Sequence, residues 1–331
     1  MMFSTMPLKQ QLVILRQWCG DIYWREAILC VPAIIVVLAF SSLLNPIMAV
    51  VMISTAFSVG LGASHTLCSM RWGAMIVAVA GMALAAFAGS LLGFYPSVVI
   101  VITALLAAAC AAIASYDNNW WWVMLQIIIA FLVASYFPNH LEHAALRTVF
   151  VLLGGALQIG CTALLARLIP NIAAPLPTTN PLASSLSLRF VCAGAIAVAL
   201  ALYTAQSISL KNDYWAPMSA LLILRPTSQD SLKRGINRLV GTVFGCCIAT
   251  LIIYLFHDNC VILLISLIIT IGLAFAMQRA HYGLYSGTIA ATIVFLIAVG
   301  HGDPIATTEH RLIATLIGGA IAIIVGRVLR V

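Results

Sequence analysis

Charged residues are scarce in this 331-residue chain: Asp, Glu, Lys and Arg make up 8% of it, against roughly 25% in a soluble domain. Only nine residues are acidic. The chain has no paired carboxylates, no nucleophile elbow and no phosphate-binding glycine loop. These absences argue against an enzyme, and we expect no cofactor.

Disulfide and metal motifs are lacking as well. The nine cysteines form no Cys-x-x-Cys motif and most lie within apolar stretches, which indicates buried thiols rather than a disulfide framework. His140 and His143 have a spacing that can bind a metal, but no third ligand is near them in the sequence. We therefore expect no metal site.

Apolar residues make up 63% of the chain, and the mean hydropathy is +1.11. A transmembrane helix needs about 20 apolar residues, and stretches of this kind recur along almost the whole sequence. The fold class expected is an all-α polytopic membrane protein with about 12 transmembrane helices. The stretches are 27–44, 46–64, 72–94, 97–116, 120–137, 147–167, 190–210, 214–225, 236–256, 259–278, 282–300 and 311–328.

Two segments fall outside these stretches. Residues 1–26 place Leu8, Leu12, Leu15, Ile22 and Tyr23 at helical spacing, which is typical of an interfacial amphipathic helix. Residues 170–188 contain four prolines and read as a linker. The expected domains are thus 1–26, a six-helix unit at 27–169, the linker 170–188 and a second six-helix unit at 189–331.

Basic residues predict the orientation, because cytoplasmic loops retain Lys and Arg. With both termini in the cytoplasm, 13 of the 16 basic residues fall on the cytoplasmic side, and only Arg147, Lys211 and Arg311 fall outside. The net charge of +7 therefore reflects membrane topology and contact with lipid, and it indicates no nucleic-acid partner.

The two six-helix units look like copies of each other. Arg147 precedes Gly154-Gly155 as Arg311 precedes Gly318-Gly319, at an offset of 164 residues. Arg71 and Arg234 correspond at an offset of 163. Because six spans return the chain to its starting side, the copies are expected to be parallel and related by an axis along the membrane normal.

Polar residues concentrate between Asp213 and Arg238. Only eleven residues separate Asp213 from Arg225, about half the hydrocarbon thickness as a helix. Pro217 near the start predicts a helix interrupted within the membrane, and Asn45-Pro46 occupies the corresponding place in the first half. Such segments in matching positions are a pointer to a transporter binding site.

Asp213 is a candidate proton carrier, because an ionised Asp at membrane depth needs a partner or a water-filled cavity. Alternatively, it lies at the headgroup level and pairs with Lys211. Tyr214 and Trp215 are either an interfacial aromatic belt or a stacking surface for a flat substrate.

Arginines supply the candidate anion site. Arg225, Arg234 and Arg238 are either cytoplasmic anchors or ligands for a carboxylate, and Arg234 and Arg238 share a helical face. Arg147 and Arg311 are candidate outer gates; local ion pairs with Glu142 and Glu309 are the alternative.

The residues of this segment resemble a known family. Tyr214-Trp215-Ala216-Pro217, Arg225-Pro226, Arg234, Arg238, Gly241, Thr242 and Gly245 are similar to the signature of the fusaric acid resistance and aromatic acid exporter proteins. The first half resembles a degenerate copy without the Tyr-Trp-x-Pro element.

The resemblance implies export of aromatic or related weak organic acids across a bacterial inner membrane, driven by the proton motive force, often with a periplasmic adaptor protein. The substrate partner would be a small organic anion. A passive organic-anion channel through the interface of the two units is the alternative.

Overall fold

The computed structural model describes residues 20, 22–41, 43–170, 187–256, 259–300 and 304–329, and in these residues it is all helical. Most of the N-terminal segment and of the linker expected at 170–188 lies outside them, and so does Arg330. Ile22 and Tyr23 are not helical, and the Tyr23 N–H donates to the Ala276 carbonyl (2.9 Å). The elements are α2 (Trp24–Ser41), α3 (Pro46–Gly60), the 3-10 helix η1 (Leu61–Ser64), α4 (Gly73–Leu92), α5 (Pro96–Ile113), α6 (Asn118–Tyr136), α7 (Leu141–Leu168), α8 (Leu188–Ser207), α9 (Trp215–Ile223), α10 (Ser228–Phe256), α11 (Cys260–Ala276), α12 (Tyr282–Val299) and α13 (Pro304–Val328).

Each of the twelve expected stretches overlaps one α-helix, and in the described residues ten helices are long and apolar enough to cross a membrane. The protein is a multi-pass membrane protein. The two helices that fall short are α9, with nine residues, and α11, with 17. The count of twelve membrane spans therefore stays a prediction, whereas the helical fold class is confirmed.

Several prolines lie in the first turn of a helix, whereas Pro32 lies inside α2. Pro46 and Pro96 occupy the first turn of α3 and α5, where the N–H of a residue has no intrahelical partner, and the Asn45 side chain caps α3. Pro217 lies in the first turn of α9, which runs without a break. The expected interruption at Pro217 is thus wrong; α9 is short because it ends before Arg225-Pro226.

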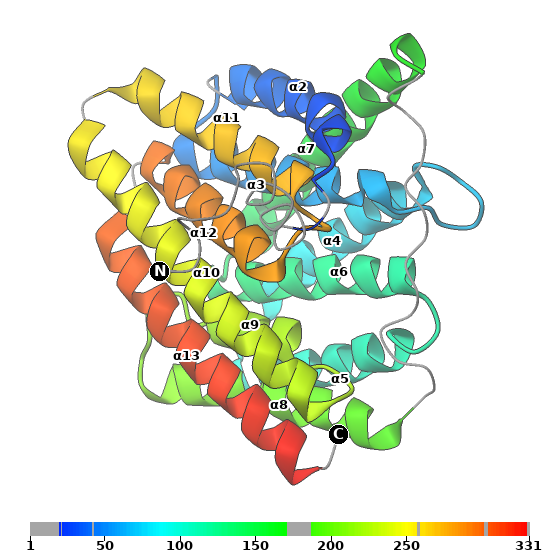
Figure 1. Cartoon of the computed structure of the whole chain (residues 1–331), viewed down its shortest axis with the longest axis vertical. Coiled ribbons are helices and arrows are strands. Elements are labelled where there is room, and N and C mark those ends of the chain that lie inside the picture. The colour runs from blue at the N-terminus through cyan, green and yellow to red at the C-terminus, as the bar shows by residue number, and fades with distance from the viewer. Residues whose placement is uncertain are drawn as a thin grey trace, which may run out of the picture.

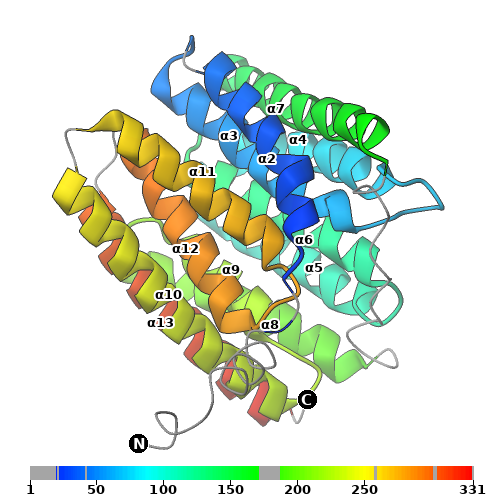
Figure 2. The same ribbon diagram turned by 45° about the horizontal axis from the view of Figure 1, so that its top comes forward.

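The helices of the two halves pack in matching pairs. In the first half α4 packs on α6, α3 on α7 and α2 on α7; in the second half α10 packs on α12, α9 on α13 and α8 on α13. Between the halves, α2 lies beside α11 at one edge of the bundle and α5 beside α8 at the opposite edge (Figure 1). The helices α10, α12 and α13 lie together on one side, and α3, α4 and α7 on the other (Figure 2).

Glycines allow the closest of these contacts. A Cβ at Gly241 or Gly245 would collide with the carbonyl oxygens of Gly283 and Gly287, so the backbones of α10 and α12 are in direct contact. Similarly, Gly154 of α7 touches the Met52 carbonyl of α3, and Gly318 of α13 touches the Ala216 carbonyl of α9. Both partners of the second pair lie 164 residues after those of the first.

Candidate functional site

The short helix α9 carries polar groups at both ends. Nine residues span about 14 Å, roughly half the hydrocarbon thickness. The chain enters α9 through a tight turn in which Ser209 and Asn212 adopt positive φ angles (53° and 55°). It leaves α9 at Leu224 and continues as the non-helical Arg225-Pro226. Seven of the nine residues of α9 are buried, so protein surrounds this helix.

Two of the three arginines after α9 contact Tyr282, the first residue of α12, and Arg225 interacts electrostatically with Tyr282 and Arg234. The Arg234 guanidinium lies 3.5 Å from the centre of the Tyr282 ring, and its Nε donates to the Leu222 carbonyl (2.8 Å). Arg238 donates to the Tyr282 hydroxyl and to Ser219 Oγ, both at 3.4 Å. Arg225 lies over the ring of Trp121 (5.4 Å), and its backbone N–H donates to Ser231 Oγ (2.9 Å). We call Arg225, Arg234 and Arg238 the arginine cluster.

The arginine cluster is short of negative charge. Arg225 and Arg238 are buried, and no described Asp or Glu forms an ion pair with any of the three arginines. Asp230, the nearest acid in sequence, accepts a hydrogen bond from Thr227 Oγ1 (2.6 Å). Burial, together with the repulsion from Arg234, lowers the pKa of Arg225 to about 9. A cavity of about 20 Å³ beside Arg225 has room for little more than one water molecule.

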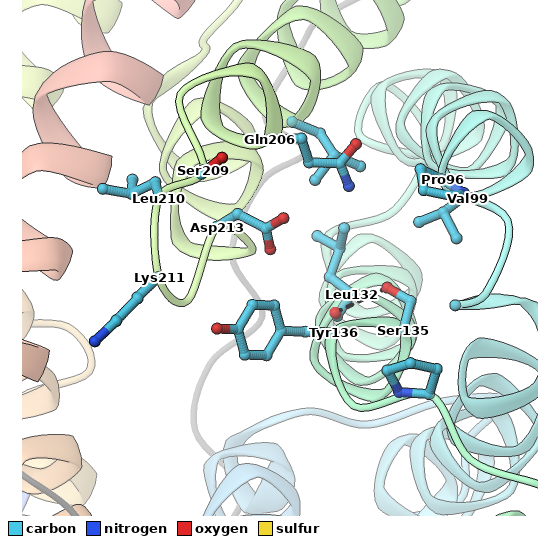
Figure 3. A pocket seen from close by; sticks show the side chains of 13 residues that line it. Pro96, Val99, Leu132, Ser135, Tyr136, Gln206, Ser209, Leu210, Lys211 and Asp213 are labelled. Atoms are coloured by element: carbon cyan, nitrogen blue, oxygen red, sulfur yellow. Dashed lines mark hydrogen bonds between the residues drawn. The ribbon is translucent and has the colours of Figure 1, made fainter.

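A larger cavity lies at the other end of α9. Its volume is about 420 Å³, and the ends of α5, α6 and α8 and the turn before α9 line it. The Asp213 carboxylate points into this cavity across from Tyr136 and Leu132, whereas Lys211 extends away from Asp213 (Figure 3). We call this space the Asp213 cavity.

Asp213 has the properties of a group that exchanges protons. Burial raises the pKa of its carboxyl to about 6, and hydrogen bonds from the Gln206 side chain and the Tyr214 backbone N–H oppose this increase only in part. No ion pair joins Asp213 to Lys211. The alternative of a headgroup-level pair therefore lacks its expected contact.

Tyr214 and Trp215 lie inside the protein, each 8% exposed, whereas residues of an interfacial belt face lipid. The Tyr214 ring meets edge to face (5.2 Å) that of Tyr136, which lines the Asp213 cavity. Trp215 packs under the guanidinium of Arg311 on α13 (4.0 Å). These rings are thus interior groups between the two polar ends of α9.

Arg147 and Arg311, the candidate gates, are both buried. Arg147 donates to Ser90 Oγ (2.6 Å), the Ala134 carbonyl (3.3 Å) and the Phe137 carbonyl (2.9 Å). Neither arginine forms an ion pair with a described acid, so the expected local pairs with Glu142 and Glu309 do not occur.

Several residues of the site could not be predicted from the sequence. Tyr282 is the centre of the arginine cluster, but the sequence shows it only as part of a polar-aromatic run that matches Asn118–Trp122. Tyr136 contributes to the Asp213 cavity from α6, which is far from Asp213 in the chain, whereas Gln206 lies at the end of α8, seven residues before Asp213. No pattern in the sequence joins Tyr136 to Asp213; only the fold brings them together.

Comparison with known proteins identifies the second half. Residues 190–325 match the fusaric acid resistance protein-like family. The match covers α8 to α13 almost completely, so the resemblance expected from Tyr214 to Gly245 is confirmed, and the arginine cluster, Trp215 and Arg311 all lie in the part that matches this family.

Two curated proteins are similar over stretches of comparable length. An uncharacterized protein of Synechocystis sp. is 29% identical over 140 residues, which cover 41% of this chain and 18% of that protein. A UPF0421 protein of Oceanobacillus iheyensis is 31% identical over 130 residues, which cover 39% of this chain and 36% of that protein. The similarity thus spans about a fifth and about a third of these relatives. No solved structure matches the chain.

Proposed function

We propose that this protein is a transporter that exports aromatic or related weak organic acids, and that the arginine cluster recognises their carboxylates. The observation that carries the proposal is the gathering of three guanidinium groups near Tyr282 with no acid of the described chain paired to them. A buried positive charge without a partner is costly, and an organic anion would supply the missing charge.

Proton coupling is the second part of the proposal. Asp213 lines a cavity of about 420 Å³ and has a pKa of about 6, which suits uptake of a proton on an acidic side and its release on a neutral one. In the orientation that the basic residues predict, the Asp213 cavity faces outward and the arginine cluster faces the cytoplasm. An entering proton would then drive an organic anion outward.

The architecture that we propose is a pair of parallel six-helix repeats. Support comes from the matched packing of the two halves and from the contacts of Gly154 and Gly318 with carbonyls 164 residues apart. The pathway would follow the interface of the repeats. We further propose a bacterial inner-membrane location with cytoplasmic termini; a periplasmic adaptor would extend the export route.

Flux measurements in proteoliposomes test the proposal. A panel of aromatic and aliphatic carboxylates, a cationic drug and a neutral drug would be offered under separately imposed pH and voltage gradients. We expect aromatic carboxylates to move fastest, driven by the pH gradient. Preference for the cation or the neutral drug would refute the substrate class, and a voltage-driven anion current that needs no pH gradient would replace the exporter with a channel.

A further inference from the structure

The two arginines that correspond between the halves have different surroundings. The Nη1 of Arg147 on α7 donates to Ser90, Ala134 and Phe137, and so ties α7 to α4 and α6. At the offset of 164 residues, Ser90 corresponds to Tyr254, whose side chain is 73% exposed and thus turned away from the interior. The acceptor that Arg147 finds on α4 therefore has no equivalent for Arg311 on α10.

Arg311 is the more deeply buried of the two, at 2% exposure, and its Nη1 has no hydrogen-bond partner in the described residues. Its guanidinium lies over the ring of Trp215, and the Trp215 indole Nε1 is also buried; the Tyr214 side chain lies beside it, but not in a geometry that makes a hydrogen bond. Two N–H donors on adjacent helices, one of them charged, thus lie in the same place with no acceptor. A carboxylate has two oxygens and accepts from two such donors at once.

Arg311 also lies between the two polar ends of α9. On one side, Arg311 is close enough to Arg238 of the arginine cluster for the two positive charges to repel each other. On the other side, Arg311 interacts electrostatically with Tyr214, and the Tyr214 ring contacts Tyr136 in the wall of the Asp213 cavity. An anion that leaves the arginine cluster for the Asp213 cavity would therefore pass this point. The negative charge of the anion would also reduce the repulsion between Arg238 and Arg311.

We propose that Arg311 and Trp215 form a second binding site for the carboxylate of the transported acid, between the arginine cluster and the Asp213 cavity. The proposal rests on the proposed function and assigns the two residues to substrate binding rather than to an outer gate. Arg147, by contrast, is a structural residue, because its Nη1 donates to acceptors of α4 and of the end of α6.

Equilibrium binding of benzoate to the purified full-length protein tests this site, with the benzoate-induced increase in melting temperature as the readout and benzoate flux in proteoliposomes alongside. Trp215→Phe keeps the ring under Arg311 but removes the N–H donor. We expect it to raise both the dissociation constant and the KM about tenfold, as for the loss of one hydrogen bond to a charged group, with kcat less affected. Arg311→Gln should remove the part of the benzoate-induced stabilisation that this second site supplies and leave the part that the arginine cluster supplies.

Arg147→Gln is the matched control. It should lower the melting temperature without benzoate and leave the benzoate-induced increase intact. If Arg311→Gln does not fold, Trp215→Phe decides alone. The site would be refuted if the dissociation constant for benzoate is unchanged in Trp215→Phe, or if Arg147→Gln loses as much benzoate binding as Arg311→Gln. In either case, carboxylate flux in the wild type would still support the transport function. Absence of any carboxylate flux in the wild type would instead overturn the proposed function.

Discussion

Replacement of Asp213 by Asn should uncouple transport from the proton gradient. With a pKa of about 6, the Asp213 carboxyl is about 90% protonated at an outer pH of 5 and about 3% protonated at a cytoplasmic pH of 7.5. A carboxyl with the ordinary value of 3.8 would be only about 6% protonated at pH 5. Burial in the wall of the Asp213 cavity is therefore what lets this residue change charge between the two sides.

The assay is benzoate flux into or out of proteoliposomes, with the membrane voltage held at zero and the pH varied on the side of the Asp213 cavity. Wild-type flux should rise as the pH falls and reach half of its maximum near pH 6, because protonation increases as pH decreases through the pKa. Asp213→Asn should show no such dependence, whereas Asp213→Glu should keep it with a shifted midpoint.

Lys211→Gln provides the control for the alternative pairing. Lys211 is exposed and extends away from Asp213 (Figure 3), so its removal should leave the midpoint unchanged. A midpoint that rises in Lys211→Gln would show that the lysine stabilises the ionised carboxylate. Full pH-driven flux in Asp213→Asn would refute the assignment of Asp213 as the proton carrier.

Three further predictions concern the arginines and the packing. Arg234→Gln should raise the KM for benzoate about tenfold or more, since it removes a charged donor from the arginine cluster. Arg71 lies over Trp72 in the first half, so Arg71→Gln should leave the KM unchanged in the same flux assay. Gly241→Leu should lower the melting temperature by several degrees because its side chain would collide with the Gly283 carbonyl; Gly160→Ala, with nothing within 4 Å, should not. Asp117→Ala removes the N-cap of α6 and should cost about 1 kcal/mol in thermal unfolding; an unchanged transition would mean that the cap contributes nothing.

The positions of the helices follow from local properties of the sequence, and that is why they could be predicted. Long apolar stretches must form helices in lipid, where a backbone N–H or carbonyl finds no water, so hydropathy alone located each of them. The predicted interruption at Pro217 is wrong because the effect of a proline depends on its position within a helix. In the first turn it replaces an N–H that has no partner anyway, and hydropathy does not report where the first turn lies.

The candidate site was only partly predictable for the same reason. Asp213, Arg225, Arg234 and Arg238 stand out because charge is rare in the chain, and rarity is visible in a sequence. Tyr282 is one aromatic residue among many, and its role comes from the approach of α12 to α10 through paired glycines. The difference between Arg147 and Arg311 could not be read from the sequence either, because it depends on acceptors from other helices.

In the repeat architecture that we propose, the arginine cluster lies in the second half because two helix boundaries differ between the halves. At the offset of 164 residues, η1 continues α3 through the positions that correspond to Arg225 and Pro226. A residue before proline is driven out of the helical region, so Arg225-Pro226 ends α9 one turn earlier and leaves the arginine in a buried loop.

The second boundary is the start of α10. This helix begins at Ser228, nine residues before the position that corresponds to the start of α4 at Gly73, and the added turns carry Arg234. In the first half, residues 65–72 of the same region are non-helical and include Arg71, and the apolar Leu61 and Ala74 occupy the positions that correspond to Arg225 and Arg238. In the repeat architecture that we propose, a shortened α9 and a lengthened α10 are thus the differences that place the arginine cluster in the second half.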